Sequence, residues 1–194
     1  MPHEAVVEMI VDFDDFCENE HRLDLLHELH DANPAFRCTL FAIPAKGSDE
    51  FWESVPDWCE LAVHGWEHPH SREAEHWTYD DTTLVFSKAH PRFVPGFKAP
   101  GWQISNGSYM AAIAFGWWVA DHWENNHRRP IGMLTHVVTP AACDGLDPEH
   151  WHGHIPNVCG NGIEESFPRL LATVKETAVF EWVSERVTPW KSHW

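Results

Sequence analysis

Short apolar runs alternate with helical patterns along almost the whole of this chain. The runs are nearly continuous in apolar residues, as in strands covered on both faces. They cover residues 5–11, 37–43, 61–63, 93–97, 117–120, 131–138 and 178–183. Helical patterns cover residues 21–32, 50–58, 82–89, 106–115 and 163–177. This alternation predicts an α/β fold in which parallel strands are joined by right-handed crossovers.

Acidic residues end the first of these runs. Asp12, Asp14 and Asp15 lie within four positions, and carboxylates this close repel one another unless a cation or hydrogen-bond donors lie among them. An acidic first turn of a helix is the alternative interpretation. In folds of parallel strands, functional groups gather at the carboxyl ends of the strands. The sequence therefore favours a functional site at this end.

Two histidines four residues apart, His64 and His68, follow the third run. They can bind one metal ion if the chain makes a single turn between them. Pro69 disfavours the helical conformation at His68, so we expect a strand end, a tight turn and a loop that continues to residue 81. The chain holds sixteen histidines, so this spacing can also arise by chance. We expect His70 and His76 to face solvent.

The later strand ends carry Lys98, Asp121 and, in the extended stretch 149–155, His152 and His154. Alternate residues of an extended segment point the same way, so the two histidines share a face. Pro100 and Gly101 enforce a turn after Lys98, and the glycine allows backbone N–H groups to approach a ligand closely.

Together, these strand ends offer the groups needed for metal-assisted hydrolysis of an amide or ester. One carboxylate with two imidazoles is a set that binds a catalytic zinc-type ion and leaves coordination positions open. A second carboxylate would take a proton from water, and a late histidine would donate one to the leaving group. Backbone N–H groups at the Gly101 turn would hold a developing oxyanion.

Taken in order, these segments resemble the motifs of the polysaccharide deacetylases of the NodB-homology type, carbohydrate esterase family four. The resemblance is carried by Phe13-Asp14-Asp15, His64-Gly65-Trp66-Glu67-His68, Lys98-Ala99-Pro100-Gly101-Trp102, the strand end from Trp118 to Asp121, and Trp151-His152-Gly153-His154. It covers residues 6–155. It implies a distorted, incomplete (β/α) barrel and a single catalytic domain over residues 1–194.

The resemblance also implies the metal site and the base. Asp14 would be the general base that activates water. The ligands of one divalent ion would be Asp15, His64 and His68, with zinc as the first expectation and cobalt or nickel as alternatives. Lys98 takes the position of an arginine that orients the base, and we expect Asp121 as its partner.

The remaining roles follow from the third and fifth motifs. The backbone N–H of Gly101 or Trp102 would contribute to an oxyanion hole. Either His152 or His154 would be the general acid that protonates the leaving amine, and we favour His154.

Several positions depart from the family pattern. Phe16 stands where the family has glycine, Gly65 replaces a hydroxyl residue, and Lys98 lacks the planar fork of arginine. Asp12 is an additional carboxylate that would either bind the metal or only accept hydrogen bonds. We therefore expect a smaller acylated sugar, or another small amide or ester, at least as readily as a cell-wall polymer.

The composition excludes several classes of partner. A formal charge of −17 argues against nucleic acid and against anionic membrane surfaces. Five cysteines without a C-x-x-C pair indicate free thiols in a reducing compartment. No signal sequence or long apolar segment is evident, so we expect a cytoplasmic protein. The oligomeric state is not predicted.

Two other function classes stay open at this point. A carbohydrate-binding relative would keep the fold and perform no catalysis, although a base beside a metal has no use in a binding module. Twelve tryptophans offer planes for sugar rings, and core packing accounts for most of them. A histidine-rich metal-storage protein would bind several ions with no defined ligand set.

Overall fold

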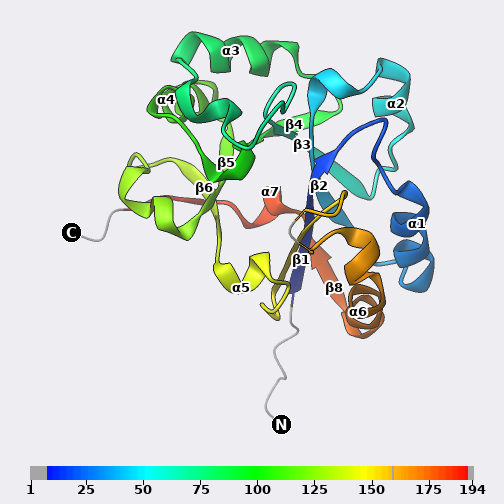
Figure 1. Ribbon diagram of the computed structural model, residues 1–194. Helices are drawn as coiled ribbons and strands as arrows, with labels where there is room; N and C mark the ends of the chain where they lie inside the picture. The colour runs from blue at the N-terminus through cyan, green and yellow to red at the C-terminus, as the bar shows by residue number, and fades with distance from the viewer. Residues whose placement is uncertain (1–7, 159, 192–194) are drawn as a thin grey trace.

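The computed structural model describes residues 8–158 and 160–191 and shows one curled sheet with helices on its outer side (Figure 1). The strands are β1 (Glu8–Phe16), β2 (Cys38–Ala42), β3 (Cys59–His64), β4 (Phe93–Lys98), β5 (Trp118–His122), β6 (Leu134–Val138), β7 (His150–His154), β8 (Val179–Glu181) and β9 (Thr188–Pro189). The helices are α1 (Leu23–Ala32), α2 (Asp49–Ser54), α3 (Tyr79–Lys88), α4 (Asn106–Phe115), α5 (Pro140–Cys143), α6 (Ile163–Glu176) and α7 (Val183–Arg186).

The sheet is a barrel that does not close. Its strand order is β7-β1-β2-β3-β4-β5-β6-β9, with β8 paired to the beginning of β1. All these pairs are parallel except that of β6 with β9. Within the described ranges, β6 and β7 form no hydrogen-bonded pair, and we call the gap between them the seam. The expected distorted, incomplete (β/α) barrel is therefore confirmed.

Two apolar layers hold the helices on the outer side of the sheet. Alternate residues of β1, such as Val11 and Phe13, pack against α1, α2 and α6. A second cluster packs β3, β4 and β5 against α3 and α4, with Phe97 and Tyr109 among its buried members. These layers account for the periodic apolar residues of the helices.

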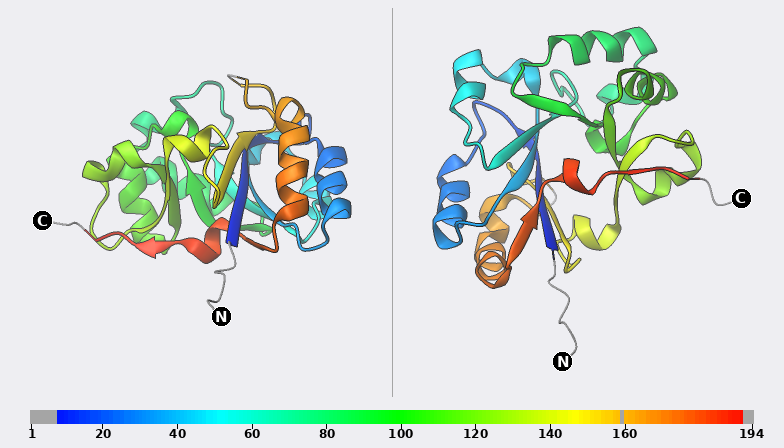
Figure 2. Two further views of the ribbon diagram at one scale, coloured as in Figure 1. Left: turned by 90° about the horizontal axis from the view of Figure 1, so that it is seen from below. Right: turned by 180° about the vertical axis from the view of Figure 1, so that it is seen from behind.

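The inner side of the sheet is divided into an apolar part and a polar part. Ile10, Phe41, Ala62 and Trp118 form a small apolar cluster with Val183 of α7. The segment that follows β8 crosses one end of the barrel (Figure 2). Further along β1, the inward positions change from isoleucine to aspartate, so the carboxyl end of the barrel is polar inside.

Most expected elements lie close to the observed ones, and the differences have local causes. α3 begins at Tyr79 rather than at residue 82, because the hydroxyl of Thr78 accepts a hydrogen bond from the backbone of Asp81 in a capping box. The expected strand 178–183 divides into β8 and α7, where Val183 turns into the barrel. α5 and β9 were not expected from the sequence.

Some expectations concern residues beyond these elements or outside the described ranges. The stretch 68–81, expected as loop, includes a 3₁₀ turn at Glu73–His76 and the first residues of α3. Residues 5–7 of the first expected strand lie outside the described residues. Four cysteines, Cys17, Cys38, Cys59 and Cys143, are free thiols, and Cys159 lies outside the described residues. In the described ranges, no helix combines the length and apolar character needed to cross a membrane.

Candidate functional site

A bulge at the end of β1 turns two consecutive carboxylates toward the same place. In a regular strand, Asp14 and Asp15 would point to opposite faces of the sheet. The register of β1 against β2 shifts between Phe13 and Phe16, and Asp15 adopts a left-handed conformation with φ of 65°. As a result, Asp14 Oδ2 and Asp15 Oδ1 lie 3.7 Å and 3.6 Å from the Nε2 atom of His64.

The turn after β3 is built around the carboxylate of Glu73. Its two oxygens accept hydrogen bonds from the backbone N–H groups of Trp66, Glu67 and His68, at 2.9, 3.0 and 3.2 Å. The turn begins at Gly65, whose φ is 70°, and a Cβ there would lie 2.2 Å from Glu73 Oε2. A larger residue would be strained at this φ and would displace Glu73 from the turn, which accounts for glycine in place of a hydroxyl residue.

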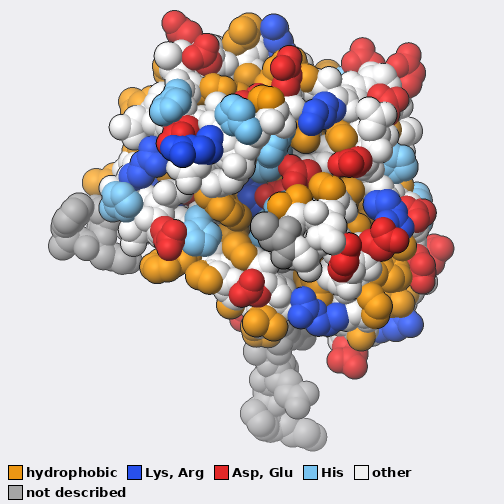
Figure 3. Space-filling view, in the orientation of Figure 1, with side chains coloured by type: hydrophobic (Ala, Val, Ile, Leu, Met, Phe, Trp, Pro, Cys, Tyr) orange, Lys and Arg blue, Asp and Glu red, His pale blue; other side chains and the backbone are white. Residues whose placement is uncertain are grey.

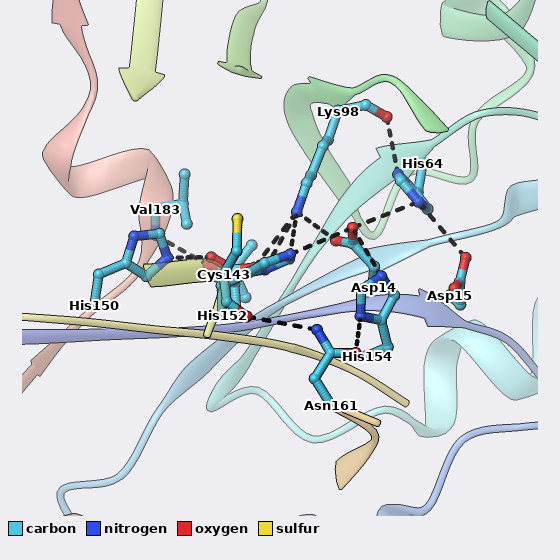
Figure 4. Close-up of polar contacts among 12 residues, drawn as sticks. Asp14, Asp15, His64, Lys98, Cys143, His150, His152, His154, Asn161 and Val183 are labelled. Carbon is cyan, nitrogen blue, oxygen red and sulfur yellow. Dashed lines mark hydrogen bonds and ion pairs between the residues drawn. The ribbon is translucent and has the colours of Figure 1, made fainter. Parts of the chain in front are cut away.

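The residues expected to bind metal are brought together by this bulge and this turn. Asp15 Oδ1, His64 Nε2 and His68 Nε2 lie within 4.8 Å of one another. Asp15 Oδ1 lies 3.2 Å from His68 Nε2 and 3.6 Å from His64 Nε2. His64 comes from the end of β3 and Asp15 from the end of β1 (Figure 4).

The donor atoms of this set suit a divalent ion. His64 Nδ1 lies 3.0 Å from the carbonyl oxygen of Lys98, which can only accept, so Nδ1 carries the proton and Nε2 keeps its lone pair. Burial lowers the pKa of His64, which favours the neutral ring. Asp15 Oδ1 is buried and has no hydrogen-bond partner among the described residues. A cation at this point would satisfy that oxygen.

A fully buried ammonium group holds the neighbouring aspartate. Lys98 Nζ lies 2.6 Å from Asp14 Oδ1 and 3.7 Å from Asp12 Oδ1. It also lies over the aromatic faces of Phe41 and Trp102, 4.6 Å and 4.1 Å from the ring centroids. Burial alone would raise the pKa of Asp14, but Lys98 and the surrounding histidines hold it well below its usual value. Asp14 is therefore ionised.

The free oxygen of Asp14 faces histidines on two sides. Oδ2 lies 3.7 Å from His64 Nε2, 3.8 Å from His152 Nε2 and 3.9 Å from His154 Nε2. Because Lys98 occupies Oδ1, only Oδ2 is directed toward the expected metal ligands (Figure 4). This geometry suits a group that accepts a proton beside them.

Asp12 is a hydrogen-bond acceptor in the part of the barrel below Asp14. Its Oδ1 lies 2.5 Å from His152 Nδ1, and its Oδ2 lies 2.5 Å from His150 Nε2. Burial would raise its pKa, but His152, Lys98 and His150 hold it well below its usual value. Asp12 is not part of the Asp15 cluster, so of the two expected alternatives, hydrogen bonding describes it at this site.

The two late histidines differ in exposure and in partners. They lie two residues apart on β7 and face inward, in register with Asp12 and Asp14 of β1. The side chain of His152 is 2% exposed, and its Nδ1 is held by Asp12. That of His154 is 19% exposed, and its Nδ1 lies 2.9 Å from Asn161 Oδ1. His154 is thus the more open to an incoming molecule.

The turn at Pro100-Gly101-Trp102 lies beside these groups. Gly101 and Trp102 both have positive φ values, 56° and 61°. The backbone N–H of Trp102 donates to the carbonyl of Ala99 at 3.0 Å, so it is already used and does not suit an oxyanion hole. The expectation for Gly101 stays a prediction. The Trp102 ring contributes a half-buried wall between Lys98 and His122.

Asp121 is not the partner of Lys98, so that expectation is wrong. Its Oδ2 accepts hydrogen bonds from Tyr109 and Arg129, and its Oδ1 accepts one from Asn125 at 2.8 Å. The Asn125 side chain in turn donates to the carbonyl of Trp102 at 2.9 Å. Asp121 therefore supports the turn that carries Trp102. The cause is the inward position of Lys98, which directs the ammonium into the barrel.

Some residues of the site had no clear signal in the sequence. Glu73 lies in a stretch expected to be loop, and its role depends on a turn that the sequence does not specify. Asn161 is placed by the chain after β7. His150 precedes His152 by two residues in the same alternating pattern, so the sequence does indicate that His150 shares a face with His152 and His154. The exposure expected for His70 and His76 is confirmed.

The surface above the site is acidic and histidine-rich. Figure 3 shows acidic and histidine side chains gathered near the middle of the face seen in Figure 1, beside a lysine or arginine group set lower in the surface. The side chains of Asp15, His68 and His154 are 15%, 17% and 19% exposed, so an incoming molecule can reach them from the surface.

No family model matches the chain, and no curated protein matches its sequence. The fold, in contrast, has counterparts among solved structures. One is a peptidoglycan N-acetylglucosamine deacetylase, with a TM-score of 0.63 and 13% identity over 93% of this chain and 88% of that one. Another is the Xyl-CE4 domain of a multidomain xylanase from the hindgut metagenome of Trinervitermes trinervoides. Its TM-score is 0.60, with 13% identity over 97% and 95% of the two chains.

A third counterpart is described as a pseudoenzyme of carbohydrate esterase family 4, from Bacillus anthracis. Its TM-score is 0.56, with 13% identity over 94% of this chain and 66% of that one. These likenesses confirm that the chain has the fold of the family it resembles in sequence motifs.

The donor set predicts a zinc-binding experiment. His64→Ala and His68→Ala should each lower the zinc content by one ion per chain relative to the unaltered protein, because each removes an imidazole from a three-ligand set. Elemental analysis of tag-free protein purified without chelator measures this. His76→Ala, which removes an exposed histidine, is the control and should change nothing. Full zinc content in both altered proteins would show that the ligands are wrongly assigned.

Proposed function

We propose that this protein is a metal-dependent hydrolase that removes an acyl group, in the first place an N-acetyl group, from a carbohydrate or related amide. The observation that carries the proposal is the state of Asp14. One of its oxygens is held by a buried ammonium at 2.6 Å, and the other faces the Asp15-His64-His68 set. An ionised carboxylate beside a metal-ligand set is what hydrolysis by an activated water requires.

The reaction adds water to the acyl carbonyl and breaks the carbon–nitrogen bond. When bound by Asp15, His64 and His68, a divalent ion would polarise that carbonyl and make water more acidic, with zinc as the first candidate. Asp14 Oδ2 takes one proton from the attacking water. Lys98 keeps its bond to Oδ1 throughout and so fixes the direction of the accepting oxygen.

The tetrahedral intermediate then breaks down with transfer of a proton to the leaving amine. His154 is the proposed general acid, since its Nε2 faces the base and its side chain is partly open to solvent. Asn161 holds Nδ1, which fixes the orientation of the ring. The backbone N–H of Gly101 is the proposed donor to the oxyanion. The products are a free amine and a carboxylate such as acetate.

A carbohydrate is the proposed substrate class for two reasons. Two of the solved structures with this fold are named as a domain of a xylanase and as a deacetylase of peptidoglycan N-acetylglucosamine. In this chain, aromatic rings lead outward from the site, with centroid distances of 5.5 Å from Trp102 to His122 and 6.0 Å from His122 to Trp123. Trp123 is 44% exposed, and such planes suit stacking of sugar rings.

The proposal treats residues 1–194 as one catalytic domain. The charge of −17 makes nucleic acid an unsuitable partner, so a small or oligomeric neutral substrate fits better.

A non-catalytic sugar-binding protein is the second candidate. Its support is the fold shared with a protein described as a pseudoenzyme, together with lysine in place of the family's arginine. An ionised Asp14 beside the ligand set argues against it, because binding alone does not require a base. Sugar binding without acetate release would favour this candidate.

Replacement of Asp14 separates the base from the metal ligands. Asp14→Asn should keep the zinc content and lower kcat by roughly 10²- to 10⁴-fold, because the amide cannot accept the proton. Acetate release from N-acetylglucosamine oligomers measures turnover, and Asp31→Asn, at an exposed position on α1, is the control. Loss of zinc together with turnover would make Asp14 a ligand instead.

The two late histidines should differ in kinetics. His154→Gln should lower kcat by roughly 10²-fold or more with little change in KM, because it removes the proton donor. His152→Gln should lower kcat less than His154→Gln does, since the His152 ring is buried and contacts Lys98 and Asp12. Steady-state rates on the same oligomers show which of the two histidines is the general acid. A larger loss in His152→Gln would reverse the assignment.

Lys98 should affect both stability and the pH profile. Lys98→Met removes the positive charge that keeps the pKa of Asp14 low, so that pKa rises and the acidic limb of kcat/KM moves to higher pH. Loss of this buried partner should also cost about 3–5 kcal/mol in the free energy of unfolding.

Lys98→Arg keeps the charge and should shift the acidic limb of the kcat/KM profile less than Lys98→Met does. Lys175→Met, at an exposed position on α6, is the control and should leave the profile unchanged. An unchanged pH profile in folded Lys98→Met protein would contradict the role given to Lys98.

A further inference from the structure

Three buried side chains meet at the seam of the barrel, apart from the Asp15 cluster. Asp12 comes from β1, His136 from β6 and His150 from β7. One potential ligand atom from each lies within 4.8 Å of the other two. The imidazole rings of His136 and His150 have centroids 4.9 Å apart. In Figure 4, His150 lies beside Val183, at the end of the polar cluster away from His64.

Among the described residues, hydrogen bonds satisfy two members of this cluster, Asp12 and His150. His150 Nε2 and Asp12 Oδ2 lie 2.5 Å apart. His136 Nε2, in contrast, is buried and has no hydrogen-bond partner in the described part of the chain, and the residue is only 7% exposed. A buried nitrogen with an unmet lone pair or proton is costly, so this atom indicates a missing partner.

Among the described residues, no strand ladder holds the seam closed. β6 pairs with β5 on one side and with the short β9 on the other, and β7 pairs with β1. Across the described ranges, no ladder joins β6 to β7. The rings of His136 and His150, 4.9 Å apart, form a side-chain contact between these two strands.

We propose that Asp12, His136 and His150 form a second divalent-metal site of the zinc type, which ties β6 to β7 across the seam. Two imidazole nitrogens and one carboxylate oxygen are ligands that zinc accepts in a tetrahedral site, with the fourth position left to water. The two proposed sites share no ligand. At Asp12, Oδ2 faces the seam while Oδ1 accepts from His152.

The surroundings of the cluster allow an ion to enter. A cavity of about 270 Å³ lies beside it, and its lining includes His136, His150, Asp147, Glu149 and Arg186. The volume leaves room for a water molecule as a further ligand. Asp147 and Glu149 bring two negative charges to this lining against one positive charge from Arg186, which lies 3.8 Å from Glu149, so the balance still favours a cation.

The proposal is tested with Zn²⁺ alone, in a protein that lacks the first site. The double variant His64→Ala/His68→Ala should still bind one zinc per chain, measured by elemental analysis and by titration. Adding His136→Gln should abolish that binding or weaken it by more than 100-fold. Loss of a residue that only hydrogen-bonds a metal ligand lowers metal affinity by roughly 10- to 100-fold, so a larger loss identifies His136 as a ligand. Adding His76→Gln in place of His136→Gln is the control and should leave it unchanged.

A stability measurement complements the metal analysis. Because the ion would join two strands, a chelator should lower the Tm of the His64→Ala/His68→Ala protein and leave the Tm of the triple variant unchanged. His136→Leu, which fills the space without offering a ligand atom, should behave like His136→Gln. Circular dichroism is used to check that both variants fold.

Two results would overturn the seam site. One is a His64→Ala/His68→Ala protein that binds no Zn²⁺ at micromolar concentrations. The other is a triple variant, folded and carrying His136→Gln, that binds zinc as tightly as its parent. Neither result bears on the proposed hydrolase, whose ligands are removed throughout, so the two proposals fail separately.

Discussion

The ammonium group of Lys98 holds the interior of this barrel together. It is fully buried and lies 2.6 Å from Asp14 and 3.7 Å from Asp12. Two carboxylates this deep in a protein would repel each other and favour protonation, and Lys98 together with the surrounding histidines keeps both ionised. Because it joins β4 to β1, removing it would leave uncompensated buried charge at the point where the strands converge.

The remaining polar groups are arranged in layers along β1 and β7. Ile10, Asp12 and Asp14 point inward in turn, and each stands in register with a histidine of β7: His150, His152 and His154. Ile10 belongs to an apolar cluster with Phe41, Ala62, Trp118 and Val183. The layer of Asp14 opens to the surface and suits chemistry on a substrate. Asp12 itself is fully buried, and its layer borders the cavity at the seam rather than the opening beside Asp14, which suits a structural role.

The sequence predicts much of this arrangement because period and spacing are local properties. Parallel strands, the ends that carry Asp15 and His64, and the shared face of His152 and His154 all follow from them. The partner of Lys98 did not follow, because it depends on which side of the sheet β4 presents. Glu73 and His136 were missed, since their roles come from contacts between segments far apart in the chain. The glycine at position 65 became explicable only when Glu73 was seen beneath it.

The central claim is that Asp15, His64 and His68 bind a divalent ion while Asp14 stands beside it as a base. The most direct measurement is a crystal structure of the zinc-loaded protein with anomalous data collected at the zinc edge. We expect an anomalous peak at about 2.0–2.2 Å from one oxygen of Asp15 and from the Nε2 atoms of both histidines, with Asp14 outside the ligand set. A peak bound to Asp14, or none near these residues, would contradict the claim.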